Sequence, residues 1–177
     1  MRTLIVVSLA LVSCSKKLET KRTERLDFKG FTVPVPAGWN EVTDSRITGQ
    51  TPAGGHVVMM VDAPKGFAPS IYIQELELGP NDHQQLVGAT MDTCRDVMGK
   101  QMVEMTHTSL GTVRVANFNG LKGCDIDLAD QKTEQAARQI SISNGKLAVS
   151  LTCNHDKKGE PVVDSACVAI ASNITAK

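Results

Sequence analysis

Two Asn-Gly dipeptides constrain the fold of this chain more than any other feature of its sequence. Each of them, Asn119-Gly120 and Asn144-Gly145, lies between two segments in which apolar residues alternate with polar ones. Asn-Gly favours the two-residue turn of a β-hairpin, because both residues tolerate the positive φ that this turn requires. We therefore predict two β-hairpins and a mostly antiparallel sheet, with strands at residues 110–118, 121–128, 139–143 and 146–153.

Three more strands are predicted upstream of the hairpins. Residues 31–35 alternate and include Pro34, which an edge strand tolerates because the missing N–H has no ladder partner to lose. Residues 56–62 are almost continuously apolar, which is typical of a strand covered on both faces. Residues 70–78 form the third strand, which ends at Gly79-Pro80.

Two segments have the 3.6-residue period of an amphipathic helix. The first covers residues 82–101, where Asn81 or Asp82 can cap the start. The second begins at Glu160-Pro161, because proline suits a first helical turn that has no N–H bond to lose. Each helix is apolar on one side only, so we expect both to cover the sheet.

The N-terminus resembles the signal of bacterial lipoproteins. Arg2 precedes the apolar residues 4–12, and the run ends in Leu11-Val12-Ser13-Cys14, which is similar to a lipobox. A positive start, a short apolar run and a small residue before the cut are typical of a secretory signal, and the run is too short to span a bilayer. The resemblance implies that residues 1–13 are removed and that Cys14 carries a diacylglycerol and a further acyl chain such as palmitate. Such an anchor binds the chain to a membrane persistently.

The same resemblance predicts where the protein lies. Cys14 would hold it in the cell envelope, and Ser15 is not the aspartate that commonly retains lipoproteins in the inner membrane. We therefore expect the outer membrane, facing the periplasm, if the host is Gram-negative. Residues 15–27 contain five basic and three acidic residues and few apolar ones, so we expect residues 14–27 to be a flexible tether. Residues 28–177 then form a single domain.

Composition excludes some classes of function. The formal net charge is zero, and no block of one sign occurs in residues 28–177, so nucleic-acid binding has no electrostatic support. A hydrophobic content of 41% with 21% charged residues is typical of a globular domain.

Four cysteines remain when Cys14 is set aside, and an even number in an exported protein favours two disulfides. Zinc ligands are usually closely spaced, whereas these cysteines are 30, 29 and 14 residues apart. Four cysteines allow three pairings. We predict Cys94–Cys124 and Cys153–Cys167, because each pair would join the apolar side of a helix to an inward position on a strand.

No motif in the sequence identifies a reaction. The histidines, His56, His83, His107 and His155, stand far apart, and no nucleophile elbow, phosphate-binding loop or dinucleotide fingerprint occurs. Residues 125–136 begin like a calcium loop but lack its glycine and its final glutamate, so we interpret Asp125 and Asp127 as the solvent face of a strand. Residues 102–107 could hold a soft metal through Met102 and His107, but core packing of the methionines is favoured. We expect no enzyme activity, no cofactor and no metal.

The order of these elements, with Phe31, Val33, Pro36, Gly38 and Trp39 at the start, resembles the PsbP/DcrB-like family. The resemblance implies an α+β fold, an α/β/α sandwich with a mostly antiparallel sheet covered by two long helices. Members include photosystem accessory proteins, a bacterial envelope lipoprotein and secretion-effector chaperones, which act mostly by binding proteins. They share no catalytic motif, so no functional residue transfers to this chain.

We therefore expect a lipid-anchored envelope protein that acts as a non-catalytic binding module with a protein partner. A small-ligand or metal carrier is the alternative, followed by a hydrolase. The predicted contact surface combines the strand at residues 31–35 with the loop at residues 62–70, where Phe67 lies between glycine and alanine. An aromatic residue on a proline-stiffened loop can anchor a partner, although Phe67 could equally fold back into the core. Trp39, the only tryptophan, is expected to fill the core at the sheet's end, with ligand stacking as the alternative.

Overall fold

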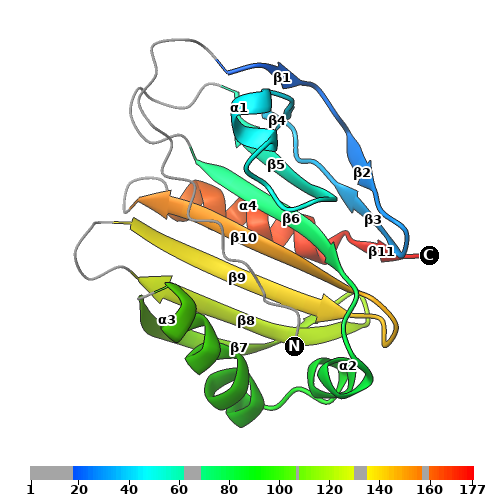
Figure 1. Cartoon of the computed structure of the whole chain (residues 1–177), viewed down its shortest axis with the longest axis vertical. Coiled ribbons are helices and arrows are strands. Elements are labelled where there is room, and N and C mark those ends of the chain that lie inside the picture. Colours follow the sequence, from blue (N-terminus) through cyan, green and yellow to red (C-terminus); the bar gives the residue numbers. More distant parts are fainter. Residues whose placement is uncertain (1–17, 62–68, 107, 130–134, 157–159) are drawn as a thin grey trace.

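A computed structural model describes residues 18–61, 69–106, 108–129, 135–156 and 160–177. Strands dominate it, and the helices are few and mostly short (Figure 1). The strands are β1 (Thr20–Lys21), β2 (Arg25–Asp27), β3 (Phe31–Pro34), β4 (Trp39–Val42), β5 (Gly55–Met60), β6 (Ser70–Leu76), β7 (Ser109–Phe118), β8 (Leu121–Ala129), β9 (Gln135–Ser143), β10 (Ala148–Asp156) and β11 (Thr175–Ala176). The helices are α1 (Ser45–Thr48), α2 (Pro80–Val87), the π-helix η1 (Thr93–Gly99), α3 (Lys100–Thr106) and α4 (Glu160–Ser172).

The main sheet has eight strands in the order β1-β4-β5-β6-β10-β9-β8-β7, and every neighbouring pair is antiparallel. Both predicted hairpins are present. Asn119 and Gly120 have φ values of 50° and 79°, the two positive angles of a type I′ turn. The second hairpin differs from the predicted two-residue turn: Ser143 pairs with Ala148, so residues 144–147 form the turn, and only Gly145 in it has a positive φ. The Asn144 side chain accepts hydrogen bonds from the backbone N–H groups of Lys146 and Leu147 and so holds this turn. The predicted α+β class with a mostly antiparallel sheet is confirmed.

One face of the main sheet packs against α4 and against a second, three-stranded sheet. The small sheet has the order β11-β3-β2, so β3 is its central strand. The prediction of an edge strand at residues 31–35 is therefore wrong. Phe31 and Val33 are fully buried against the main sheet, and β2 and β11 occupy both edges of β3. The cover of this face is thus partly a sheet, where the sequence predicts only a helix.

The described part of the predicted tether is folded, which corrects the boundary at residue 28. Residues Thr20–Lys21 pair with β4, and residues Arg25–Asp27 pair with β3. Leu26 is buried in the main core, and Leu18 packs beside α1. Two apolar side chains and free strand edges are enough to order this polar segment, because the backbone pairs with strands that already exist.

The opposite face of the main sheet carries the remaining helices (Figure 1). α1 covers a small cluster of Val42, Ile47, Val57, Met59 and Tyr72. η1 and α3 cover Val113, Cys124, Ile126 and Leu128 at the other end of the sheet. The strand β5 is buried on both faces, as expected, because Val58 joins the core on the α4 side while Val57 and Met59 face α1.

The single helix predicted at residues 82–101 is interrupted, which corrects that prediction. α2 ends at Val87 with Gly88 as its C-cap, and a new helical run starts at residue 91. The Thr90 side chain accepts a hydrogen bond from the backbone N–H of Thr93 at 3.2 Å, which caps the new run. The break separates the two helices on the sheet: α2 contacts β8 and β9, whereas η1 contacts β7 and β8.

Each of the two disulfides joins a helix to the main sheet. Cys94 of η1 pairs with Cys124 of β8, with a Cα–Cα distance of 5.4 Å. Cys153 of β10 pairs with Cys167 of α4, with a Cα–Cα distance of 6.3 Å. This is the pairing that the sequence predicts. The two bonds lie on opposite faces of the sheet and attach both layers to it.

Candidate functional site

A cleft of about 540 Å³ opens where the chain crosses between the two sheets. One wall is the connection from β1 to β2, which includes Arg22 and Glu24. The other wall is the connection from β3 to β4, where Gly38 has a φ of 83° and Trp39 begins the strand. Val61, just after β5, closes one side. Backbone bonds join these walls: the Val35 N–H donates to the Glu24 carbonyl at 2.9 Å, and the Val61 N–H donates to the Gly38 carbonyl at 2.9 Å.

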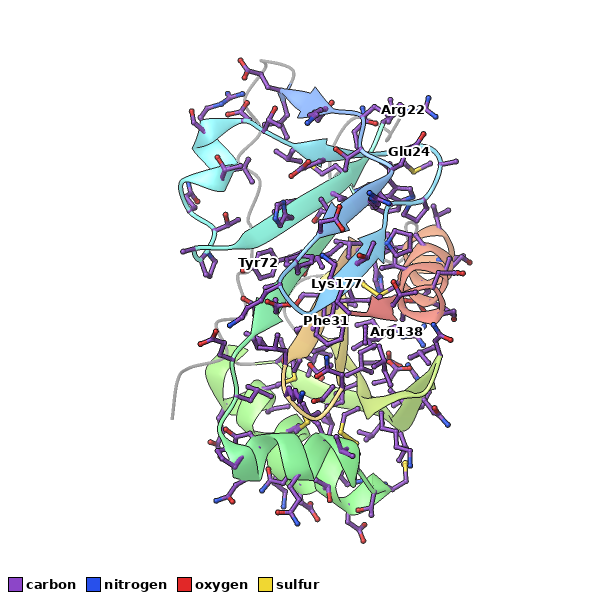
Figure 2. All side chains as sticks on the ribbon, turned by 90° about the vertical axis from the view of Figure 1, so that its right-hand side faces the viewer. Arg22, Glu24, Phe31, Tyr72, Arg138 and Lys177 are labelled. Carbon is purple, nitrogen blue, oxygen red and sulfur yellow. A yellow bond between two sulfur atoms is a disulfide. The ribbon has the colours of Figure 1, made fainter. Side chains whose placement is uncertain are left out.

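The lining of the cleft is amphipathic. Val35 and Trp39 are buried at its base, whereas Val61 is 48% exposed. Arg22 and Glu24 are exposed at the rim and have no ion pair within the described part of the chain; Figure 2 shows both at one end of the molecule. An apolar base with a few charged groups at the rim is the usual composition of a ligand site, and the volume lies in the usual range.

Beside the cleft, hydrogen bonds around Glu41 fix the β1–β2 connection to the main sheet. The Thr23 hydroxyl donates to Glu41 Oε2 at 3.0 Å, and His56 Nδ1 lies 2.7 Å from Glu41 Oε1. The ring of Phe28 meets the His56 ring edge-on, with centroids 5.3 Å apart. These contacts make the cleft wall a preformed part of the fold.

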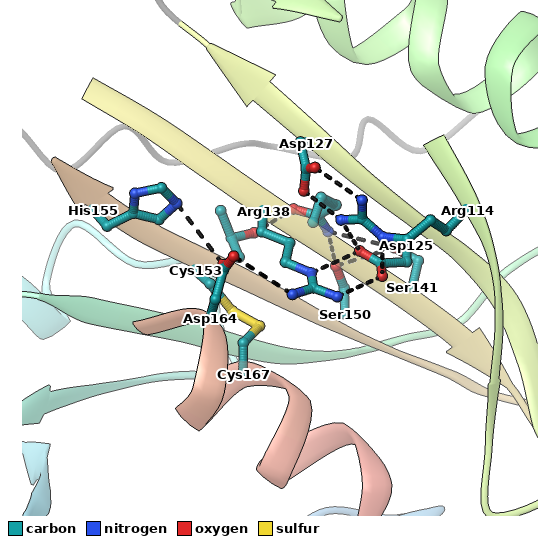
Figure 3. The surroundings of a disulfide bond; sticks show 12 residues. Arg114, Asp125, Asp127, Arg138, Ser141, Ser150, Cys153, His155, Asp164 and Cys167 are labelled. Carbon is teal, nitrogen blue, oxygen red and sulfur yellow. Dashed lines mark hydrogen bonds and ion pairs between the residues drawn. A yellow bond between two sulfur atoms is a disulfide. The ribbon is translucent and has the colours of Figure 1, made fainter. Parts of the chain in front are cut away.

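A cluster of charged side chains lies on the α4 side of the sheet, beside the Cys153–Cys167 disulfide (Figure 3). Asp125 is buried and receives hydrogen bonds from two guanidinium groups: Arg138 Nε at 2.9 Å and Arg114 Nε at 2.9 Å. Arg114 also donates to Asp127 Oδ1 at 2.6 Å. On α4, Asp164 lies 3.6 Å from Arg138 Nη1 and 3.9 Å from His155 Nε2.

The electrostatics of this cluster are those of a structural network. Burial alone raises the pKa of Asp125, but the hydrogen bonds from Arg138 and Arg114 outweigh it and hold that pKa below its ordinary value. The hydrogen bonds of Arg138 to Asp125 raise the pKa of Arg138, against the effect of burial. A carboxylate kept ionised between two guanidinium groups cannot exchange a proton near neutral pH, so it is unsuited to acid–base catalysis.

The structure corrects the predicted role of Asp125 and separates the other candidates. Asp125 faces away from Cys124 and Ile126, as expected, but it is covered by arginines where the sequence predicts contact with solvent. His56 and His155 lie in different parts of the fold. The side chain of His83 and the whole of His107 lie outside the described residues. Among the residues the structure describes, no group of three or more His, Cys, Asp or Glu side chains could hold a metal ion.

Methionine placement also bears on the soft-metal alternative. Met59 and Met102 are buried in two separate apolar clusters, which is the core packing favoured from the sequence. Met91 is exposed. The described methionines therefore do not converge on one point.

Two predicted binding features have different outcomes. The strand at residues 31–35 is buried and offers no contact surface, except that Val35 forms part of the cleft base. Phe67 and Cys14 lie outside the described residues. The cleft residues Arg22 and Glu24 were missed, because a run of charged residues is more typical of a tether. The one weak sign in the sequence that this segment is folded is Leu26, a single apolar residue between Arg25 and Asp27.

Comparison with known proteins identifies the fold. No protein-family model matches the sequence, and no curated protein matches it. The chain is similar to the solution structure of cyanobacterial PsbP (CyanoP) from Synechocystis sp. PCC 6803, with a TM-score of 0.60 and 14% identity over 94% of this chain and 99% of that chain. It is also similar to LpqN of Mycobacterium tuberculosis, which is involved in cell envelope biogenesis, with a TM-score of 0.57 and 12% identity over 92% of each chain. A Pseudomonas aeruginosa protein has a TM-score of 0.52 and 11% identity over 89% of this chain and 99% of that chain. The fold is therefore PsbP-like.

Two observations concern the compartment. Disulfides persist in oxidising surroundings, so the two bonds indicate an extracytoplasmic location. None of the helices in the described part of the chain is long and apolar enough to cross a membrane.

Proposed function

We propose that this protein is a non-catalytic binding module of the bacterial cell envelope, and that the cleft beside Trp39 is its binding site. The observation that carries the proposal is the amphipathic cleft itself: an apolar base, an exposed valine and two charged side chains at the rim. The charged cluster at Asp125 is a structural network, so it offers no competing site.

The occupant we propose is a segment of another envelope protein. The cleft is open to solvent between two chain crossings, so an extended segment can enter without a movement of the fold. Apolar side chains of the partner would contact Val35, Trp39 and Val61, and its polar groups would meet Arg22 and Glu24. PsbP-like structures include an envelope protein, which agrees with this setting.

A site-specific crosslinker tests the proposal. A photoreactive residue at position 61 should capture a defined partner in intact envelopes, because Val61 lines the cleft. Position 162 is the matched control: Val162 on α4 is 45% exposed, against 48% for Val61, but lies outside the cleft. The same adducts at both positions, or none at position 61, would contradict the proposal.

A small-ligand carrier is the second candidate, since a volume of about 540 Å³ also suits a small molecule. Trp39 is the only tryptophan, so its fluorescence reports occupancy of the cleft directly. A change in emission with low-molecular-mass envelope extract, without adducts at position 61, would favour the carrier.

We also propose that the protein is anchored by lipid at Cys14, on the outer membrane if the host is Gram-negative. The support is the sequence Leu11-Val12-Ser13-Cys14 after an apolar run, together with the two disulfides of an exported protein. Such an anchor would keep the cleft close to partners in the same envelope.

A further inference from the structure

The strand β7 forms one edge of the main sheet, and its outer backbone groups are not paired within the described residues. β7 pairs only with β8, and none of the turn, loop or cap hydrogen bonds involves its backbone. The other edge is β1, which is much shorter. A long exposed edge is a template for another strand.

The turn at Asn119-Gly120 fixes which groups of β7 point outward. In a two-residue hairpin, the residues next to the turn, Phe118 and Leu121, form a hydrogen-bonded pair, and the pairs then alternate along the strands. The backbone of Arg114 and Ala116 therefore bonds to β8. The N–H and C=O groups of Val113, Val115 and Asn117 point away from the sheet.

These three residues are arranged symmetrically about Val115. If a second copy of the strand runs antiparallel with Val115 opposite Val115, then Val113 lies opposite Asn117 at both ends. Each of the three pairs can exchange two hydrogen bonds, because all three residues have outward groups. The edge is therefore complementary to itself, as an interface with two-fold symmetry requires.

Side chains and charge also favour self-pairing. Val115 is 43% exposed, one of the few large apolar residues at the surface of the described part of the chain, and it would pack against its own copy. Arg114 is the only charged residue of β7, and its charge is neutralised by Asp125 and Asp127 in the same molecule. The strand has no proline or lysine, the residues that commonly protect an edge. The irregular register between Leu110 and Val113 limits pairing to the second half of β7.

We propose that two copies of this chain associate through β7, in an antiparallel pair centred on Val115. The two main sheets then form one continuous sheet. The cleft beside Trp39 lies at the opposite end of each sheet, near β1 and β4, so a dimer would present two clefts.

Sedimentation velocity of the full chain over a range of concentrations tests the association. The wild type should move from monomer to dimer as concentration rises. Val115→Lys should stay monomeric, because two ammonium groups would meet at the axis. Val162→Lys is the matched control on α4 and should behave like the wild type. A wild type that stays monomeric at the highest attainable concentration, or Val115→Lys dimers equal to those of the wild type, would overturn the proposal.

Crosslinking tests the register. In a Cys14→Ser background, Val115→Cys should form an intermolecular disulfide, because a hydrogen-bonded antiparallel pair places its Cα atoms about 5.5 Å apart. Asn117→Cys is an exposed control on the same strand, and it should not crosslink because it faces Val113 of the second copy. Equal crosslinking of the two variants would contradict this register. A chain that stays monomeric but binds an extended peptide at β7 would assign the edge to another protein and refute self-pairing.

Discussion

The carboxylate of Asp125 is a single group on which the stability of the fold should depend strongly. It is buried and receives hydrogen bonds from both Arg114 and Arg138. We predict that Asp125→Asn lowers the free energy of unfolding by about 3–5 kcal/mol, since it leaves Arg138 partly buried without its main counter-ion. Urea unfolding at pH 7 measures the loss. Asp127→Asn is the matched control on the same strand: its side chain is 36% exposed, so we expect a loss of about 1 kcal/mol or less.

The same carboxylate predicts how stability depends on pH. Its folded pKa lies below the ordinary value of 3.8, because the hydrogen bonds from the two arginines outweigh the effect of burial. A lowered folded pKa adds stability that is fully present above the unfolded pKa and is lost as the pH falls through the folded pKa. The difference between wild type and Asp125→Asn should therefore be constant from pH 7 to about pH 5 and shrink below pH 4. A difference unchanged down to pH 2 would refute this role of Asp125.

The sequence predicts which face of the strand Asp125 occupies, but it does not predict which groups cover that face. The alternation of Cys124, Ile126 and Leu128 assigns Asp125 to the other face, and the structure agrees. That this face is covered depends on Arg138, which lies on the next strand, and on α4, which is far along the chain. A charge partner brought by tertiary packing leaves no local signal, so the sequence indicates solvent where the fold supplies arginines.

Among the helices and strands, those encoded by neighbouring residues are predicted correctly, and those that depend on contacts with distant residues are not. The hairpin at Asn119-Gly120 is encoded by adjacent residues, and it forms as expected. The small sheet has only weak local signals, because β2 is three residues long and pairs with β3 through the short turn at residues 28–31, while β11 is two residues long and comes from the far end of the chain. Gly88, the C-cap of α2, and Thr90, which caps the next helical run, are signs of the break between the two helices. The 3.6-residue apolar period continues across the break, so the sequence pattern predicts a single helix.

The two disulfides differ in the length of chain that they close, which gives a prediction for stability. In the chain-entropy model, the Cys153–Cys167 bond, with a separation of 14 residues, contributes about 3 kcal/mol, and the Cys94–Cys124 bond, with a separation of 30, about 3.5–4 kcal/mol. Replacing both cysteines of a pair by alanine should lower the free energy of unfolding, and the loss should be larger for Cys94–Cys124 than for Cys153–Cys167. Peptide mapping without reduction checks the pairing itself. Crossed peptides would show that η1 and α4 are wrongly placed on the sheet.

The fold of this protein as a whole does not by itself show what the protein binds. The PsbP-like fold follows from similar structures that share 12–14% of their residues with this chain, and such distant similarity says nothing about a shared ligand. The binding proposal therefore depends on this chain's own cleft and on its composition. Its charge is balanced overall, so under this proposal the local pattern of Arg22, Glu24 and the apolar base would select a partner, with little steering by a net field.

The lipid anchor is the prediction that most affects how the whole molecule works, because it sets which partners the cleft can meet. Cys14 follows Leu11-Val12-Ser13, and the other four cysteines are paired in disulfides, so only Cys14 should take up lipid. Growth with a clickable fatty acid should label the wild type and leave Cys14→Ser unlabelled. Membrane fractionation should then place the wild type with the outer membrane of a Gram-negative host and Cys14→Ser in the soluble periplasmic fraction, since two or more acyl chains hold a protein on a bilayer and their loss releases it. Label on both proteins, or the same distribution of both between fractions, would refute the anchor.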